Sequence, residues 1–258
     1  MRRVDHPYSV STDYQRYYWE TQWQDYDEEK MLADVRWEGI LPVALRVFAR
    51  GSRLLEAGCG TGKYCLALSR AGRRVVGVDF ARAGLVAARH VEPQLGVLQG
   101  SVVEMPFRDH CFDGALSLGV VEHFQSGPEA ALRELARVIR PGGTLLLTVP
   151  FQNLLLELKE LFLPTHDNAS VADMVFYQYL YRRDEMAACL GKAGFRVAMV
   201  KYIGKQLGLS EAGAHVEGVK NATRALARII HPWTEPDGLD ASSRRSDEGA
   251  GWRPASEE

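Results

Sequence analysis

The sequence predicts an α/β domain built on a doubly wound, mostly parallel sheet of the Rossmann-like kind. Three observations support this prediction. Short apolar runs alternate with helical patterns from residue 53 onward, the run 144–149 is apolar on both faces, and a glycine-rich turn at 58–62 joins the first strand to the first helix. Right-handed crossovers place the carboxyl ends of parallel strands at one edge, so we expect the ligand site there.

Composition limits the class of protein. The chain has 258 residues, of which 46% are hydrophobic, enough for one α/β domain with additional elements. A net charge of −2, with acids and bases intermixed, makes a nucleic-acid partner unlikely. No run approaches the length of a membrane span, and no apolar run follows Arg2 and Arg3 as in a signal peptide. The four cysteines form no C-x-x-C pair, so we expect reduced thiols and a cytoplasmic protein.

Residues 1–39 are expected to form a helical lid. The stretch 8–26 is dense in tyrosine and tryptophan, and it fits an amphipathic helix whose aromatic stripe packs on the domain. The same rings would also suit a lid over a cofactor or substrate, and the two interpretations are compatible. A second helical pattern covers 31–49, with a break expected at Pro42.

The main domain is expected to span residues 40–205 with six strands. Helices are expected from residue 63 and over 81–90, 128–139 and 183–192. The strands are expected at 53–55, 74–79, 95–99, 112–118, 144–149 and 195–203.

Two segments depart from this alternation. Residues 151–180 follow the fifth strand at the ligand edge, so they are expected to form a substrate cap. Helical spacing of apolar residues predicts a C-terminal helix over 206–231, and no seventh strand is evident after Ile203, which would leave a sheet edge exposed. Residues 232–258, rich in Pro, Gly, Ser and charge, are expected to be disordered.

The glycine turn fits two phosphate-binding motifs poorly. A dinucleotide fingerprint needs G-x-G-x-x-G, whereas the third glycine here comes early, at Gly62. A Walker loop needs Ser or Thr after its Gly-Lys, whereas Tyr64 follows Lys63. Glu56, just before the turn, would also repel a pyrophosphate.

The stretch Glu56–Gly62 resembles the E/D-x-G-x-G-x-G signature of the class I S-adenosylmethionine-dependent methyltransferases. The resemblance covers roughly residues 40–205 and is strongest to the type 11 subgroup, which includes quinone-biosynthesis enzymes. It continues at the spacing of that family through Asp79, 104–107, 112–113 and 137–143.

The resemblance implies S-adenosylmethionine as the cofactor. Asp79 would accept its ribose hydroxyls, and Ser101 stands where the family commonly has an Asp that receives the adenine amino group. Glu56 would act through the ammonium group of the ligand or by ordering the glycine loop. The expected cofactor-binding residues are Glu56, Gly58, Cys59, Gly60, Gly62, Asp79, Phe80, Ser101, Val102, Leu118 and Gly119.

The expected reaction is methyl transfer to a hydroxyl or carbon of a small-molecule, lipid-like or glycan-precursor acceptor. His123 is the candidate base for a hydroxyl acceptor, or it only shapes the pocket. No metal is expected, because Glu122 and His123 lack an identifiable third ligand. The expected acceptor pocket comprises Tyr18, Glu122, His123, Tyr177 and Tyr181.

Two alternatives stay open at this point. The chain would be a cofactor-binding regulatory or scaffold protein without catalysis, or a nicotinamide-dependent oxidoreductase. The oligomeric state is not determined by the sequence.

Overall fold

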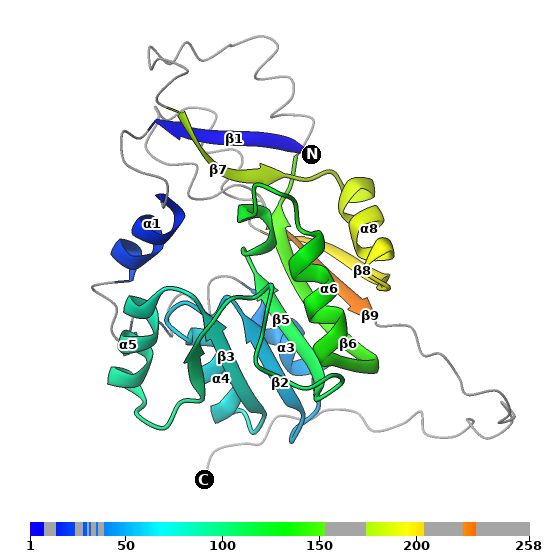
Figure 1. Ribbon diagram of the computed structural model, residues 1–258. Coiled ribbons are helices and arrows are strands. Elements are labelled where there is room, and N and C mark those ends of the chain that lie inside the picture. Colours follow the sequence, from blue (N-terminus) through cyan, green and yellow to red (C-terminus); the bar gives the residue numbers. More distant parts are fainter. Residues whose placement is uncertain are drawn as a thin grey trace, which may run out of the picture.

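The computed structural model contains a seven-stranded sheet with helices on both faces (Figure 1). It describes residues 1–7, 14–23, 28–29, 31, 35, 39–152, 174–203 and 224–230. In spatial order the strands of the sheet are β4 (Val97–Gln99), β3 (Arg74–Asp79), β2 (Arg53–Ala57), β5 (Phe112–Leu118), β6 (Ile139–Pro150), β9 (Arg224–Ile230) and β8 (Arg196–Ile203).

The first five of these strands are parallel, as the sequence predicts. Their carboxyl ends therefore meet at one edge, where β2, β3 and β5 each end in a loop. The chain reverses from β2 to β5 at this edge, since β3 and β4 lie on one side of β2 and β5 on the other. Such a reversal opens the crevice in which open α/β sheets bind ligands.

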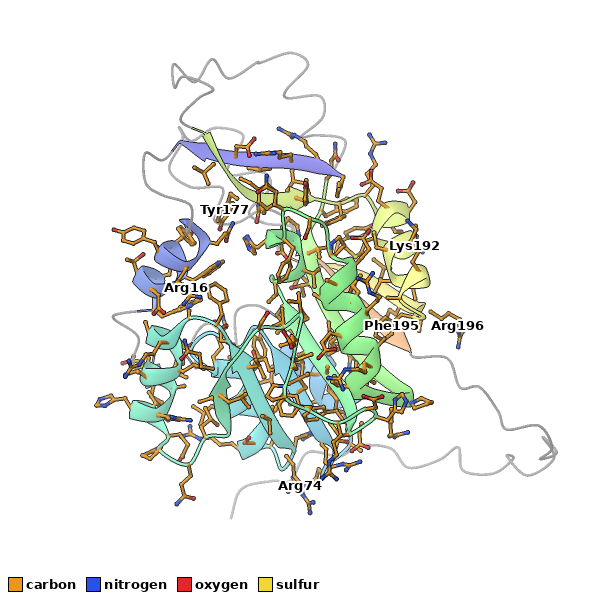
Figure 2. All side chains as sticks on the ribbon, in the orientation of Figure 1. Arg16, Arg74, Tyr177, Lys192, Phe195 and Arg196 are labelled. Carbon is orange, nitrogen blue, oxygen red and sulfur yellow. The ribbon has the colours of Figure 1, made fainter. Side chains whose placement is uncertain are left out.

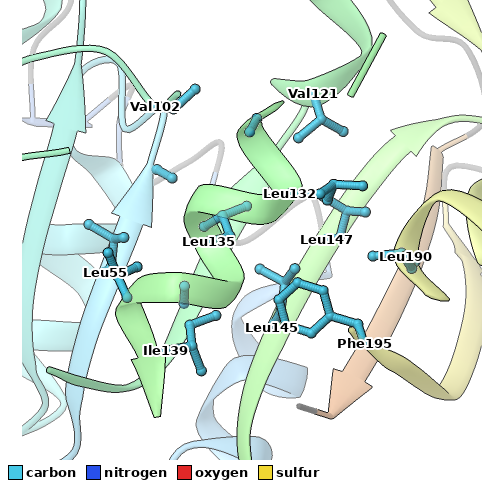
Figure 3. Packing of buried hydrophobic residues seen from close by; sticks show 14 of the residues in the cluster. Leu55, Val102, Val121, Leu132, Leu135, Ile139, Leu145, Leu147, Leu190 and Phe195 are labelled. Carbon is cyan, nitrogen blue, oxygen red and sulfur yellow. The ribbon is translucent and has the colours of Figure 1, made fainter. Parts of the chain in front are cut away.

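Two apolar layers cover the sheet. Leu145 and Leu147 of β6 face a cluster formed with α6 (Glu129–Val138) and α8 (Arg183–Lys192), part of which is seen in Figure 3. Leu146, between them, faces the opposite cluster with α3 (Leu41–Val47), α4 (Lys63–Arg70) and α5 (Arg82–Val91). This alternation explains why the strand is apolar on both faces.

The sheet has a seventh strand, which corrects the expectation of six. Residues 224–230 form β9, which lies between β6 and β8 and pairs antiparallel with both, so that β6 is not an edge strand and β8 ends the sheet. The expected helix over 206–231 is therefore wrong for 224–230, whereas 206–223 and the expected tail lie outside the described residues. Hydrogen-bonded ladders on both sides have overridden a local helical spacing, as tertiary context often does.

The N-terminal region is only partly helical, which corrects the expectation of helix over 1–39, while its role as a lid stays a prediction. Residues Arg2–Pro7 form β1, which pairs antiparallel with β7 (Met174–Leu180) in a separate two-stranded sheet (Figure 1). Helix α1 (Tyr14–Gln22) lies within the aromatic-rich stretch as predicted. Pro42 lies in the first turn of α3, where proline begins a helix rather than breaking one.

The expected cap over 151–180 is described only in part, because 153–173 lie outside the described residues. Its last part is β7, which leads into α8. No helix among the described residues is long and apolar enough to cross a membrane.

Candidate active site

At the glycine turn between β2 and α4, the backbone lies so close to neighbouring groups that side chains would not fit. Gly58, Gly60 and Gly62 have φ values of 78°, 52° and 70°, in the left-handed region that favours glycine. A Cβ on Gly58 would lie 2.3 Å from Cγ2 of Val120, which follows β5. The turn therefore packs its bare backbone against the loop after β5, at the crevice of the sheet.

Glu56 orders this turn from beneath. Its side chain is buried, and Oε2 accepts hydrogen bonds from the Cys65 backbone N–H at 2.8 Å and from the Cys65 thiol at 2.9 Å. Because the Cys65 amide belongs to the first turn of α4, the carboxylate holds the start of that helix. Burial raises the pKa of Glu56 to about 7, although the bonds from Cys65 act in the opposite direction.

Asp79 fixes the other side of the turn. At the end of β3, Oδ2 accepts the Gly60 N–H at 2.7 Å and Oδ1 accepts the Ala81 N–H at 2.8 Å. Burial raises the pKa of Asp79, and the nearby charge of Glu20 adds to this rise. Each carboxylate oxygen has a second lone pair, so Asp79 keeps the capacity to accept two ligand hydroxyls.

The other predicted cofactor residues lie along the same edge. Cys59 is buried within the turn. Leu118 ends β5 and Gly119 follows it, with the Gly119 N–H donating to Thr148 O at 3.1 Å. Phe80 is half-buried beside Asp79. After β4, Val102 is buried and Ser101 is exposed, with Ser101 Oγ accepting the Val103 N–H at 3.3 Å.

This edge fits a nucleoside-linked amino acid such as S-adenosylmethionine. The glycines expose backbone that can approach the amino acid end closely, Asp79 suits the ribose, and the exposed Ser101 hydroxyl suits the adenine. A pyrophosphate would meet the carboxylates of Glu56 and Asp79 instead. The assignment of individual residues to parts of the cofactor stays a prediction.

On the other side of the crevice, a backbone carbonyl fixes the state of His123. This residue ends the short 3₁₀ helix η1 (Val121–His123), and its Nδ1 lies 2.8 Å from Tyr177 O on β7. A carbonyl oxygen only accepts, so Nδ1 carries the hydrogen. In the neutral ring, Nε2 is then the nitrogen that can accept a proton.

Two aromatic side chains contact this imidazole, and a third packs against one of them. The rings of Trp19 and Tyr177 meet His123 edge-on, with centroids at 5.3 and 5.0 Å, and Tyr18 meets Tyr177 at 5.4 Å. Figure 2 shows Tyr177 on β7, on the side that faces α1. The structure therefore brings together three of the predicted pocket residues, Tyr18, His123 and Tyr177, from parts of the chain far apart in sequence.

Helix α1 docks on the donor side through two residues that the sequence did not single out. The Trp23 ring, just after α1, lies 3.1 Å from the position of a Cβ on Gly60 and equally close to one on Gly84, so two glycines make room for the indole. The Glu20 carboxylate accepts the N–H groups of Arg82 and Ala83, at 2.8 and 2.7 Å, at the start of α5.

Trp19 of α1 and Trp23 just after the helix continue this contact toward His123. Trp19 stacks on Trp23 with centroids 5.5 Å apart, and it is Trp19 that meets the imidazole. The signals for this contact in the sequence are the aromatic density of 8–26 and the four-residue spacing of the two tryptophans, which suits one face of a helix. The glycine turn and His123 are thus linked through a continuous series of rings.

Tyr181 and Glu122, the other predicted pocket residues, are buried. Tyr181 packs in the cluster with α6 and α8, and its hydroxyl has no hydrogen-bond partner among the described residues. Burial raises the Tyr181 pKa, as does the charge of Glu122. Their role in the pocket stays a prediction. The described part of the chain has no cluster of three or more side chains suited to a metal ion.

Comparison with known proteins finds a methyltransferase domain in this chain. Residues 55–147 match the family model described as a methyltransferase domain, and this segment contains the glycine turn, Asp79 and His123. The chain is 28% identical over 199 residues to a probable S-adenosylmethionine-dependent methyltransferase of Mycolicibacterium smegmatis, covering 77% of this chain and 73% of the relative.

Two further relatives match only part of the chain. A demethylmenaquinone methyltransferase of Corynebacterium kroppenstedtii is 38% identical over 37% of this chain and 40% of its own length. A probable tRNA methyltransferase 9B of the mouse is 36% identical over 38% of this chain and 22% of its own length. The names of these relatives indicate different acceptors, so the matches identify the methyl donor and leave the acceptor open.

The fold agrees with these matches. The magnesium protoporphyrin IX methyltransferase of Synechocystis, solved with S-adenosylhomocysteine, superimposes with a TM-score of 0.57 at 17% identity, over 86% of this chain and 95% of that one. These findings overturn the nicotinamide-dependent alternative that the glycine turn alone left open. The matches support a class I S-adenosylmethionine-dependent methyltransferase, with S-adenosylmethionine as the cofactor.

Proposed function

We propose that this protein transfers a methyl group to a hydroxyl or carbon of a small molecule, lipid-like or glycan-precursor acceptor. The observation that carries the proposal is the position of His123. Val120, just before η1, contacts Gly58 of the turn, while Trp19 joins His123 to the Trp23 ring on Gly60. A tautomer-fixed imidazole thus lies beside the expected donor site, in contact with aromatic rings that would suit an apolar or ring-bearing molecule.

S-adenosylmethionine, when bound, supplies a methyl group on a sulfonium that is already a good leaving group. The chain then has to hold donor and acceptor in line and keep water out. The turn and Asp79 would position the donor, and Tyr18, Trp19 and Tyr177 would enclose the acceptor. With a hydroxyl acceptor, His123 would take the proton at Nε2 while Nδ1–H stays bonded to Tyr177 O.

The test is His123→Asn in an assay that reads S-adenosylhomocysteine production against a metabolite library. For a hydroxyl acceptor we expect kcat to fall roughly 10²- to 10⁴-fold, while calorimetry shows unchanged cofactor affinity. His110→Asn is a matched control, because His110 Nδ1 also lies near a backbone carbonyl, Ile139 O at 3.1 Å, at the opposite end of the sheet. His110 has a φ of 57°, which Asn tolerates.

The outcomes separate the proposal from its alternatives. Full turnover in His123→Asn would show that His123 only shapes the pocket. Cofactor binding without S-adenosylhomocysteine from any library member would favour a non-catalytic regulatory or scaffold protein. Failure to bind S-adenosylmethionine at all would contradict the donor assignment itself.

We also propose that the protein works in the cytoplasm. The support is the state of its cysteines, since Cys59, Cys65, Cys111 and Cys189 are all thiols in the structure, as suits a reducing compartment.

A further inference from the structure

Gln15, on α1, has a side chain fixed in orientation by two backbone carbonyls. Its Nε2 donates to Tyr177 O at 2.8 Å and to Phe176 O at 3.3 Å. The reversed amide would place Oε1 against both carbonyl oxygens, which repel it, so the assignment of oxygen and nitrogen follows from the contacts.

This orientation leaves a buried oxygen unsatisfied. Gln15 Oε1 is shielded from solvent and has no hydrogen-bond partner among the described residues. An amide oxygen only accepts, and burying it unpaired costs free energy. Buried acceptors in proteins are normally hydrogen-bonded, so a donor for this oxygen has to be sought.

The position of Gln15 places this oxygen beside the candidate base. Tyr177 O accepts both the Gln15 amide and the His123 Nδ1–H, each at 2.8 Å, so the two side chains meet at one carbonyl. Oε1 and Nε2 of Gln15 share one carbon, so Oε1 lies close to this meeting point. Gln15 also shares a face of α1 with Tyr18 and Trp19, three and four residues later.

We propose that Gln15 is a specificity-determining residue that selects a methyl acceptor carrying a hydroxyl group. Its Oε1 accepts the hydrogen bond of a hydroxyl on a planar ring, and Tyr18, Trp19 and Tyr177 contact the ring. The inference rests on the proposed function and narrows it. A hydroxylated ring satisfies the buried oxygen, whereas an acceptor without a hydrogen-bond donor leaves it unpaired and is rejected.

The test uses phenol and anisole, two probes that differ in the hydroxyl hydrogen. Binding of each to the full-length protein saturated with S-adenosylhomocysteine is measured by calorimetry and by quenching of tryptophan fluorescence, since Trp19 lies in the pocket. We expect the wild type to bind phenol about tenfold or more tightly than anisole, because a buried acceptor discriminates against a ligand that lacks the donor.

Two variants remove the oxygen in different ways. Gln15→Met is close in size and has no polar group, and Gln15→Lys keeps a donor for the two carbonyls but has no acceptor. In both, we expect the preference for phenol to fall below about threefold while S-adenosylhomocysteine affinity stays at the wild-type value. Gln94→Met, an exposed position between α5 and β4, is the control and should keep the wild-type preference.

Three results would overturn the inference. They are equal binding of the two probes to the wild type, a preference that persists in both variants, and no binding of either probe to the loaded protein. In each case, tight binding of S-adenosylhomocysteine would leave the donor assignment intact. A wild type that fails to bind S-adenosylhomocysteine would contradict the proposed function, and this inference with it.

Discussion

The two halves of the candidate active site differ in the kinds of contact that form them and in how far apart their residues lie in the sequence. On the donor side, Gly58, Gly60 and Asp79 lie within a short stretch of chain, and backbone N–H groups make most of the contacts. On the acceptor side, side chains contact one another and the main chain of β7, and Gln15 and Tyr177 lie 162 positions apart. A few local residues thus specify the donor, whereas the acceptor depends on the assembly of distant segments.

This difference determines where variation of the amino-acid sequence is tolerated. A turn of glycines with left-handed φ accepts almost no substitution, because a side chain would meet Val120, Trp23 or Leu95. Rings that pack edge-on can be exchanged for other apolar groups with smaller cost. The donor side is therefore expected to be rigid in sequence, and the acceptor side to set specificity.

The largest effect is expected from Gly58→Ala. A methyl group there would strain the backbone at φ 78° and press on Val120, so the turn must shift. We expect S-adenosylmethionine affinity to fall roughly a hundredfold, equivalent to about 2.7 kcal/mol, as measured by calorimetry.

Gly51→Ala is the control for Gly58→Ala. Gly51 has a similar φ of 81° but nothing within 4 Å of the added carbon. It should lose about 1–2 kcal/mol of stability from strain alone and keep its cofactor affinity. Equal losses of affinity in the two variants would contradict the role of the close approach to Val120.

An intermediate effect is expected from Glu56→Gln, read as stability against pH. Because the folded state raises the Glu56 pKa from 4.5 to about 7, this group contributes stability that is fully present below pH 4.5 and is lost as pH rises through 7. The loss is on the order of 3 kcal/mol.

A neutral amide removes that dependence and can still accept the Cys65 N–H. Urea unfolding at pH 5 and pH 8 should therefore show a smaller decline for Glu56→Gln than for the wild type. Parallel declines in the two proteins would mean that Glu56 is ionised at little cost.

The smallest effect is expected where the two halves meet, at Glu20. Glu20→Gln removes the charge that α1 places on the Arg82 and Ala83 amides, an interaction worth about 0.3–1 kcal/mol. Hydrogen exchange at those amides should quicken two- to fivefold, and the acceptor KM should rise more than the cofactor Kd.

Glu28→Gln is the control for Glu20→Gln, because it loses only an exposed pair with Arg70. It should leave exchange at Arg82 and Ala83 unchanged. If Glu20→Gln also leaves it unchanged, α1 docks through Trp23 alone.

Much of the fold could be predicted from the sequence because its signals are local. Strand 112–118 and helix 183–192 match the structure to the residue, and the Gly60–Asp79 contact follows from two strands that end side by side. Glu56 was expected either to contact the ligand or to order the loop, and the structure shows its contacts with Cys65.

The rest depended on pairings that no local pattern reveals. Residues 224–230 have an apolar spacing that suits a helix, yet β6 and β8 recruit them as a strand. Strand β1, the docking of Trp23 on Gly60 and Gly84, and the meeting of Gln15 with His123 are similarly long-range. The sequence shows where aromatic and amide side chains stand in the chain, but it does not show which residues they contact.

The atom that holds His123 in place belongs to the main chain. Tyr177 O fixes the imidazole tautomer whatever side chain position 177 carries, provided that β7 keeps its course. During evolution, the tyrosine ring could thus be replaced to admit a differently shaped molecule without disturbing the proton-accepting nitrogen. At residue 177, the side chain can change which acceptor fits, while the main-chain oxygen keeps His123 in the same tautomer.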